Sequence, residues 1–149
     1  MPVEVLATPR AEQQINALDR RHRRTFDQFL DNLAAEGCNA LAYRLTGDAP
    51  LDHLCVKHLD DNIRVVVAFA TSEQAWVLLV GPHDDNDPVL NVYAELYRVL
   101  GVEPPVARGR TKPPCCDAAD EVPPVLGAVV DDILQRAAQV RRTRRPRRA

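Results

Sequence analysis

Apolar residues recur along the chain with two different periods, and these periods predict the secondary structure. Over residues 26–33 the apolar side chains have the spacing of one helix face, and Gly37 follows where a helix C-terminus is expected. A weaker helical pattern precedes this stretch after Pro9, with Ile15 and Leu18 three residues apart. The chain therefore opens with two helices, joined by a basic cluster at residues 20–24 that suits either phosphate contact or a solvated helix junction.

A third apolar stripe with helical spacing covers residues 89–100 and ends at Gly101. Asp87 and Pro88 precede it, and an N-cap carboxylate followed by a first-turn proline is the usual composition of a helix start. We therefore expect a third helix to begin there.

Short apolar runs bounded by turn-forming residues predict strands, which cover residues 3–7, 41–45, 54–59, 63–69 and 75–81. The last four follow one another without a helix between them, and strands joined in this way pair antiparallel. The predicted fold class is α+β, with two N-terminal helices and a C-terminal helix packed on an antiparallel sheet of four to five strands. Helices are expected to cover one face of the sheet and to leave the other available for a ligand or partner.

The composition changes at residue 102, which divides the chain into four parts. Residues 1–101 form the α+β domain, and residues 102–124 form a Pro-rich linker. Residues 125–140 have the pattern of an amphipathic helix that must pack on the body, on a second copy or on another protein. Folding back on the same chain is the commoner of these outcomes, and residues 141–149 form an Arg-rich tail.

The net charge of −2 conceals a strong asymmetry along the chain. Seven arginines and no acid lie from Arg136 onward, whereas the preceding part carries an excess of acidic side chains. Such a tail can neutralise phosphates without reading sequence, or it can be a solvated terminus. The candidate nucleic-acid-binding residues of the tail are Arg141, Arg142, Arg144 and Arg145.

The four cysteines show no C-x-x-C spacing, and two of them, Cys115 and Cys116, are adjacent. We expect a structural or incidental role for them, with neither a disulfide framework nor a metal site. The sequence has no signal-peptide pattern and no apolar run long enough to span a membrane. A reduced, cytoplasmic protein is the expectation that follows.

Three sequence patterns in the body resemble one known family. They are Tyr43-Arg44-Leu45, the strand Arg-Val-Val-Val-Ala-Phe beginning at Arg64, and the strand Val-Leu-Leu-Val-Gly-Pro-His ending at His83 before a Tyr-bearing helix. Together with the two-helix opening, over roughly residues 1–101, they resemble the RelE/ParE superfamily of toxins from bacterial type II toxin–antitoxin pairs. The resemblance implies a RelE-like fold and an antitoxin that wraps the toxin. Some members cut messenger RNA, usually on the ribosome, while others poison DNA gyrase.

For an RNA-cutting member the 2′-hydroxyl attacks the neighbouring phosphorus, which requires a base, an acid and cations but neither a metal nor a cofactor. By position in the family pattern, Arg64 and Lys57 are candidates for charge stabilisation, and Arg44 is a weaker one. His83 is the candidate general acid or base because imidazole titrates near neutral pH. Tyr93 is a candidate for base stacking or proton transfer.

Each candidate also has a structural reading. Arg64 could pair with Asp61, His83 could be a surface or capping residue, and Tyr93 lies on the apolar stripe of its helix. Lys57 and its neighbour His58 occupy opposite faces of one strand, so at most one of them faces a given site.

The residues after His83 depart from the nuclease pattern. Active members often carry arginine or lysine here, whereas this chain has Asp84, Asp85 and Asp87, which repel phosphate. A His-Asp-Asp ending resembles the RelE-like domains of some bacterial DNA-repair helicases. The same residues could hold a metal, but they also suit a helix N-cap, and no metal is expected.

Two further functions therefore stand beside the endoribonuclease toxin. One is a non-catalytic RelE-like module that binds a protein such as gyrase, a helicase or an antitoxin-type partner. The other is a nucleic-acid-binding protein that acts mainly through its arginine tail. The C-terminal helix could also serve self-association.

Overall fold

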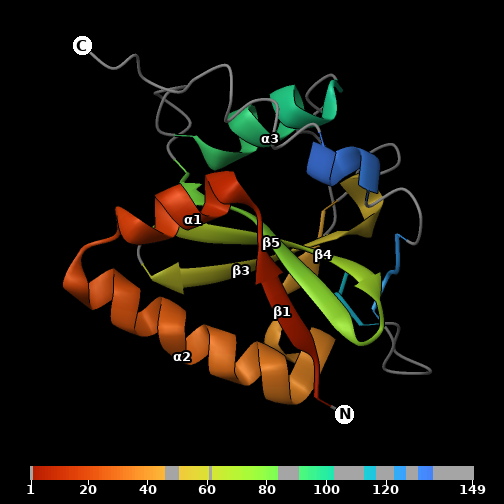
Figure 1. Cartoon of the computed structure of the whole chain (residues 1–149), viewed down its shortest axis with the longest axis horizontal. Coiled ribbons are helices and arrows are strands. Elements are labelled where there is room, and N and C mark those ends of the chain that lie inside the picture. Colours follow the sequence, from red (N-terminus) through yellow and green to blue (C-terminus); the bar gives the residue numbers. More distant parts are fainter. Residues whose placement is uncertain are drawn as a thin grey trace.

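The computed structural model describes residues 2–45, 51–60, 62–83, 91–102, 113–116, 123–126 and 131–135 of the chain. One five-stranded sheet lies at its centre, with the strand order β1-β5-β4-β3-β2 (Figure 1). The elements are β1 (Glu4–Ala7), α1 (Pro9–Asn16), α2 (Arg20–Glu36), β2 (Tyr43–Arg44), β3 (Leu54–Asp60), β4 (Ile63–Thr71), β5 (Gln74–Pro82) and α3 (Val92–Leu100), with short 3-10 helices at Gly37–Ala40 and Leu51–His53.

The predicted α+β class is confirmed, and one strand pairing differs from the expected antiparallel sheet. Strands β2 to β5 form the expected antiparallel meander. Strand β1 instead lies parallel to β5, with Glu4 opposite Gln74 and Ala7 opposite Val77. Two helices and three strands separate these partners in sequence, so neither the neighbour nor the direction of β1 follows from a local pattern. The sheet is therefore mixed.

Helices cover both faces of the sheet, so the expectation of one open face is wrong. On one face α1 packs through Ile15 and α2 through Phe26. On the other face α3 contributes Leu96, and the helical residues 131–135 contribute Ile133, which is 1% exposed. Figure 1 shows α2 and α3 on opposite sides of the strands. Because β4 is buried on both faces, it consists of a continuous apolar run rather than an alternating one.

Side-chain caps fix where the helices begin. The Thr8 hydroxyl accepts a hydrogen bond from the Ala11 N–H (3.0 Å) and donates one to the Leu78 carbonyl (2.9 Å), which ties the start of α1 to β5. Asp19 caps α2, so the basic cluster at residues 20–24 lies in the first turns of a helix and not in a junction. Asn91 caps α3, and the start predicted at residues 87–88 is therefore wrong. Residues 84–90 lie outside the described residues.

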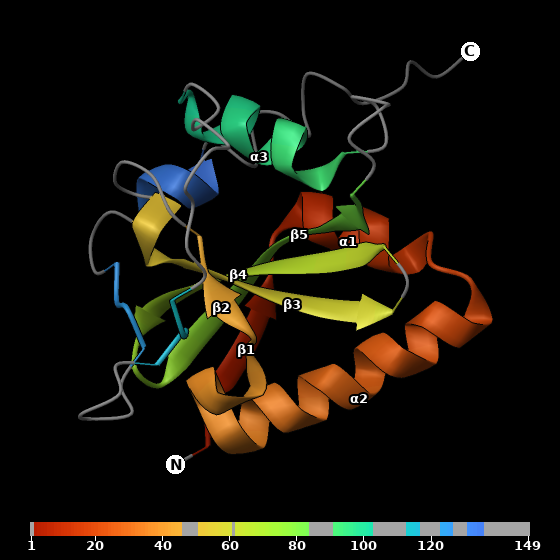
Figure 2. The ribbon, with the colours of Figure 1, turned by 180° about the vertical axis from the view of Figure 1, so that it is seen from behind.

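The chain beyond residue 102 returns to the body at three described places. The carbonyl of Pro113 accepts from the N–H of Arg44 at 2.8 Å, next to the edge strand β2 (Figure 2). Val125 forms a bridge with Phe69 and is not helical, whereas the predicted C-terminal helix is present at residues 131–135. This helix packs on its own chain through Ile133, which is the outcome that the sequence analysis gave as the commoner one.

Two disulfides join Cys115 and Cys116, which lie in the predicted linker, to the body of the protein. The expectation that no disulfide framework exists is therefore wrong. The two bridges are Cys38–Cys116 and Cys55–Cys115, with Cα–Cα distances of 5.3 and 5.6 Å. Sequence spacing gave no signal because each bridge spans 60 or more residues. No helix in the described ranges is both long and apolar enough to cross a membrane.

Each bridge should contribute to stability on its own, although Cys115 and Cys116 are adjacent. The first closure spans 60 or more residues and contributes about 4 kcal/mol of loop entropy. With one bridge in place, the other closes only the loop from Cys38 to Cys55 through Cys115 and Cys116, which contributes about 3 kcal/mol. Removing one bridge, by Cys38→Ala with Cys116→Ala or by Cys55→Ala with Cys115→Ala, should therefore cost about 3 kcal/mol, and the fourfold variant should lose about 7 kcal/mol. Denaturant unfolding of the four proteins measures these losses, and a single-bridge loss near zero would contradict the prediction.

Candidate functional site

Three of the four predicted catalytic residues lie together at one end of the sheet, on the face covered by α3. Arg64, His83 and Tyr93 are joined there by two residues that the sequence did not single out as candidates, Tyr43 and His58. We call these five residues the histidine–tyrosine cluster. The hydroxyl of Tyr43 lies 3.1 Å from Nε2 of His58 and 3.4 Å from the hydroxyl of Tyr93. The rings of His83 and Tyr93 meet edge to face, with centroids 4.8 Å apart.

Strand register explains why the cluster forms. His58 on β3 lies directly opposite Arg64 on β4, so their side chains leave the same face of the sheet. The bridge between His83 and Asn91 holds the end of β5 against the start of α3. Tyr93 follows two residues later, and its backbone N–H donates to the Asn91 side chain at 2.9 Å. Five residues from four elements and one bridge therefore converge at this end of the sheet.

Lys57 does not join this cluster. It lies opposite Val65, which packs in the core beneath α1 and α2, whereas His58 lies on the α3 face. The structure therefore places His58, and not Lys57, on the face of the sheet that carries Arg64. Regular pairing continued from Asp60 and Ile63 would place Leu59 opposite Arg64, and the irregularity between His58 and Asp60 shifts the register by one residue and brings His58 there instead. No local pattern in the sequence signals this shift.

Arg44 also lies apart from the cluster. It is opposite Cys55, on the other face from Tyr43, and its Nε donates to the carbonyl of Pro114 at 3.2 Å. Its contacts hold the disulfide-linked segment on the edge of the sheet. Tyr43, the neighbour of Arg44 in sequence, is the residue of β2 that lies in the cluster.

Burial raises the pKa of the Tyr93 phenol above its ordinary value, and the hydrogen bond with Tyr43 adds to this effect. The positive charge of Arg64 acts in the opposite direction and is outweighed. Tyr93 therefore stays protonated and can donate a hydrogen bond or stack against a ring, but it is unsuited to act as a base. It packs at the margin of the core and is not fully enclosed by it.

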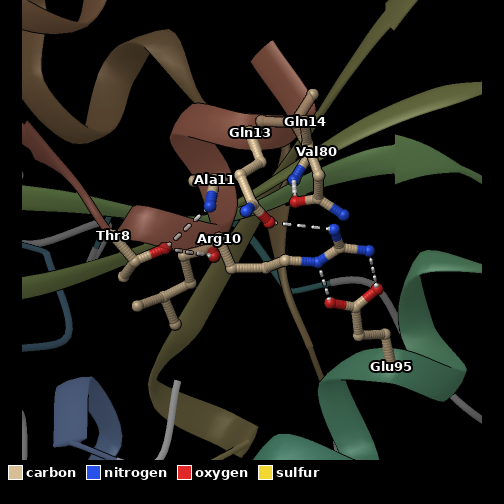
Figure 3. Close-up of polar contacts among 8 residues, drawn as sticks. Thr8, Arg10, Ala11, Gln13, Gln14, Val80 and Glu95 are labelled. Carbon is tan, nitrogen blue, oxygen red and sulfur yellow. Dashed lines mark hydrogen bonds and ion pairs between the residues drawn. The ribbon is translucent and has the colours of Figure 1, made fainter. Parts of the chain in front are cut away.

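On the other side of the same sheet end lies a cavity of about 480 Å³, between α1, the turn after α1, the end of β5 and the start of α3. An ion pair crosses its wall: Nε and Nη2 of Arg10 donate to the two carboxylate oxygens of Glu95 at 2.6 and 3.1 Å. The hydrogen bonds that Arg10 donates to Glu95 raise the pKa of Arg10. Figure 3 shows this pair joining α1 to α3, beside Gln13 and Gln14. Pockets of this size are common ligand sites.

Other predicted site residues fall outside the described ranges. These are the tail residues Arg141, Arg142, Arg144 and Arg145 and the acidic residues Asp84, Asp85 and Asp87, together with Asp61, the suggested partner of Arg64. Among the residues that the structure does describe, no group of three or more His, Cys, Asp or Glu side chains could hold a metal ion.

No protein-family model and no curated protein matches this sequence. Three solved structures are similar to it. The toxin–antitoxin complex RelBE2 from Mycobacterium tuberculosis is 16% identical, with a TM-score of 0.47, over 56% of this chain and 100% of that chain. The RelE–RelB complex from the archaeon Pyrococcus horikoshii is 22% identical, with a TM-score of 0.46, over 57% of this chain and 99% of that chain.

The third is the YoeB/ParE toxin from Agrobacterium tumefaciens, which is 14% identical, with a TM-score of 0.48, over 55% of this chain and 100% of that chain. All three are toxin–antitoxin proteins, the family that the sequence patterns resemble. At these identities the likeness concerns only the course of the chain. The chemistry has to be argued from the side chains themselves.

The pKa of Tyr93 leads to a pH dependence of stability. Above the ordinary tyrosine value of 10.0 the unfolded chain releases this proton while the folded chain retains it, so the free energy of unfolding should fall as the pH rises. Tyr93→Phe removes this contribution. Chemical unfolding of both proteins at neutral and alkaline pH should show the wild type losing stability relative to the variant. A difference that does not change with pH would contradict the burial of this phenol.

The Arg10–Glu95 pair should matter for stability, because the two side chains are only 24% and 9% exposed. Arg10→Ala leaves a buried carboxylate without its partner and should cost about 3 kcal/mol in unfolding free energy. Replacing both residues, by Arg10→Met with Glu95→Leu, should cost much less. Arg23→Ala is the control, because it breaks an exposed pair with Asp27 worth about 0.5 kcal/mol. Equal losses for Arg10→Ala and Arg23→Ala would refute the role of burial.

Proposed function

We propose that this chain is a RelE-like toxin that cleaves messenger RNA at the ribosome without a metal ion and is silenced by an antitoxin protein. One observation carries this function: two imidazoles, a guanidinium and two phenols converge in the histidine–tyrosine cluster. These are the groups that cleavage by the neighbouring 2′-hydroxyl requires, namely a base, an acid and a fixed positive charge.

Each group has a role that its geometry supports. Arg64 supplies the positive charge that stabilises the phosphorane, since its guanidinium remains charged at every physiological pH. His58 and His83 approach the Tyr43–Tyr93 pair from β3 and from the end of β5. One imidazole accepts the proton of the 2′-hydroxyl, and the other donates a proton to the leaving 5′-oxygen.

The two tyrosines orient the imidazoles and the substrate. Tyr43 shares a hydrogen bond with Nε2 of His58, which holds that ring in one orientation. Tyr93 remains neutral because its pKa is raised, so it offers a hydrogen-bond donor and a ring face to a nucleobase. The ribosomal substrate and the antitoxin partner follow from the resemblance of the sequence to the RelE/ParE superfamily. A cytoplasmic site of action belongs to the same proposal.

Expression in bacteria from a tightly controlled promoter tests this function. The wild type should arrest growth and produce new 5′ ends in total RNA, mapped by sequencing. Arg64→Ala, His58→Gln and His83→Gln should each lower cleavage about 10²-fold or more. Lys57→Gln is the matched control, since it changes a basic side chain one residue from His58 on the opposite face of β3, and it should retain cleavage.

Two results would overturn the proposal. Intact RNA and normal growth, with the protein shown to be folded, would exclude the endoribonuclease and favour the non-catalytic protein-interaction module. Cleavage lost in Lys57→Gln but retained in His58→Gln would place the chemistry on the other face of the sheet.

A further inference from the structure

The cavity beside Arg10 and Glu95 lies apart from the groups that would cleave RNA, and its lining has a chemistry of its own. We propose that it binds a neutral nucleobase rich in hydrogen-bond acceptors, and specifically uracil. The choice of a nucleobase rests on the proposed RNA-cleaving function, whereas the need for a neutral, acceptor-rich ring comes from the cavity alone.

The cavity wall carries little net charge. Arg10 is paired with Glu95 through two hydrogen bonds, so their charges cancel. Asp19 accepts a hydrogen bond from the His22 backbone N–H at 2.8 Å, and its side chain is 66% exposed, so water screens its charge. A phosphate or an amine entering the cavity would therefore find no strong opposite charge there. The cavity therefore suits a neutral ligand.

Three side-chain amides in the lining have their oxygens occupied by donors from the protein. The oxygen of Gln14 accepts from the Val80 N–H at 2.8 Å, and that of Gln13 accepts from Nη1 of Arg10 at 3.4 Å. Asn91 uses its oxygen to cap α3. These bonds fix which end of each amide is the nitrogen, and Figure 3 shows the Gln13 and Gln14 contacts.

The amide nitrogens are thus left as donors. Within the described residues, the amide nitrogens of Gln13, Gln14 and Asn91 donate to no protein group. The cavity accordingly presents donors without matching acceptors, together with apolar walls from Ile63 and Val80. A ligand with carbonyl oxygens and no amino group satisfies this arrangement.

Uracil is the RNA base with this pattern. It carries two carbonyl oxygens and no exocyclic amine, whereas adenine and cytosine each present an amino group that would face the amide donors. Guanine also carries an amino group, which lies on the same Watson–Crick edge as its carbonyl. A single pyrimidine ring fits well within about 480 Å³.

The cavity also lies where a neighbouring nucleotide could reach it. Ile63, Pro82 and Val92 line it, and each directly precedes a residue of the histidine–tyrosine cluster, namely Arg64, His83 and Tyr93. On β4, consecutive side chains project to opposite faces. The cavity and the cluster therefore lie back to back around the same end of the sheet, so an RNA strand passing over that end could occupy both.

Titration of ¹⁵N-labelled protein with nucleosides, followed through the side-chain NH₂ signals, tests this site. Uridine should shift the signals of Gln13, Gln14 and Asn91 in a saturable way, and cytidine and adenosine should bind at least about tenfold more weakly, which corresponds to about 1.4 kcal/mol. Gln14→Glu keeps the acceptor for Val80 but replaces the donor with an oxygen, so it should weaken uridine binding by about tenfold or more. Gln28→Glu makes the same change on an exposed position of α2 and should have no effect.

Three outcomes would overturn the inference: unmoved amide signals, equal affinity for the three nucleosides, or equal losses in Gln14→Glu and Gln28→Glu. Tighter binding of a small peptide amide, such as N-acetylglycinamide, would also overturn it and assign the cavity to a protein partner. The assay involves no cleavage, so a wild type that binds uridine but leaves RNA intact would refute only the proposed endoribonuclease.

Discussion

The ion pair between Arg10 and Glu95 is the contact on which the functional end of the molecule depends. It joins α1, on one face of the sheet, to α3, on the other, and it does so past the end of the strands and not through the core. In the part of the chain that the structure describes, Glu95 and Thr8 are the two buried polar residues, 7% and 0% exposed. Both residues take part in contacts that anchor α1. Because Glu95 lies on α3, its ion pair with Arg10 lets α1, on one face of the sheet, fix the position of α3 on the other face.

The position of α3 in turn determines what the two faces of the sheet end can do. Tyr93 projects into the histidine–tyrosine cluster, while Glu95, two residues later, lines the cavity on the other side. A single helix thus contributes to both sites with residues that are close in sequence and differ in direction. A change in the tilt of α3 would alter both sites together.

Local patterns in the sequence predicted most of the elements, because each was determined by residues near in sequence. The run at residues 63–69 and the stripe ending at Gly101 belong to this group. What the sequence could not supply was long-range: the parallel neighbour of β1, the cover on the second face and the partners of Cys38 and Cys55. The candidate site divides in the same way. Arg64, His83 and Tyr93 came from a family pattern, whereas His58 lies opposite Arg64 only because the register shifts between His58 and Asp60.

The two disulfides have a consequence for how the protein is made. Cys38 and Cys55 belong to the body, but their partners Cys115 and Cys116 are synthesised only after every strand and α3. Because domains fold from the N-terminus as the chain emerges from the ribosome, the sheet would assemble while both body thiols are still free. The bridges would then secure a body that is already folded. In a reducing compartment, where such bonds are rare, the same body would carry four thiols, and its C-terminal segment would be held by packing and by hydrogen bonds such as that between the Arg44 N–H and the Pro113 carbonyl.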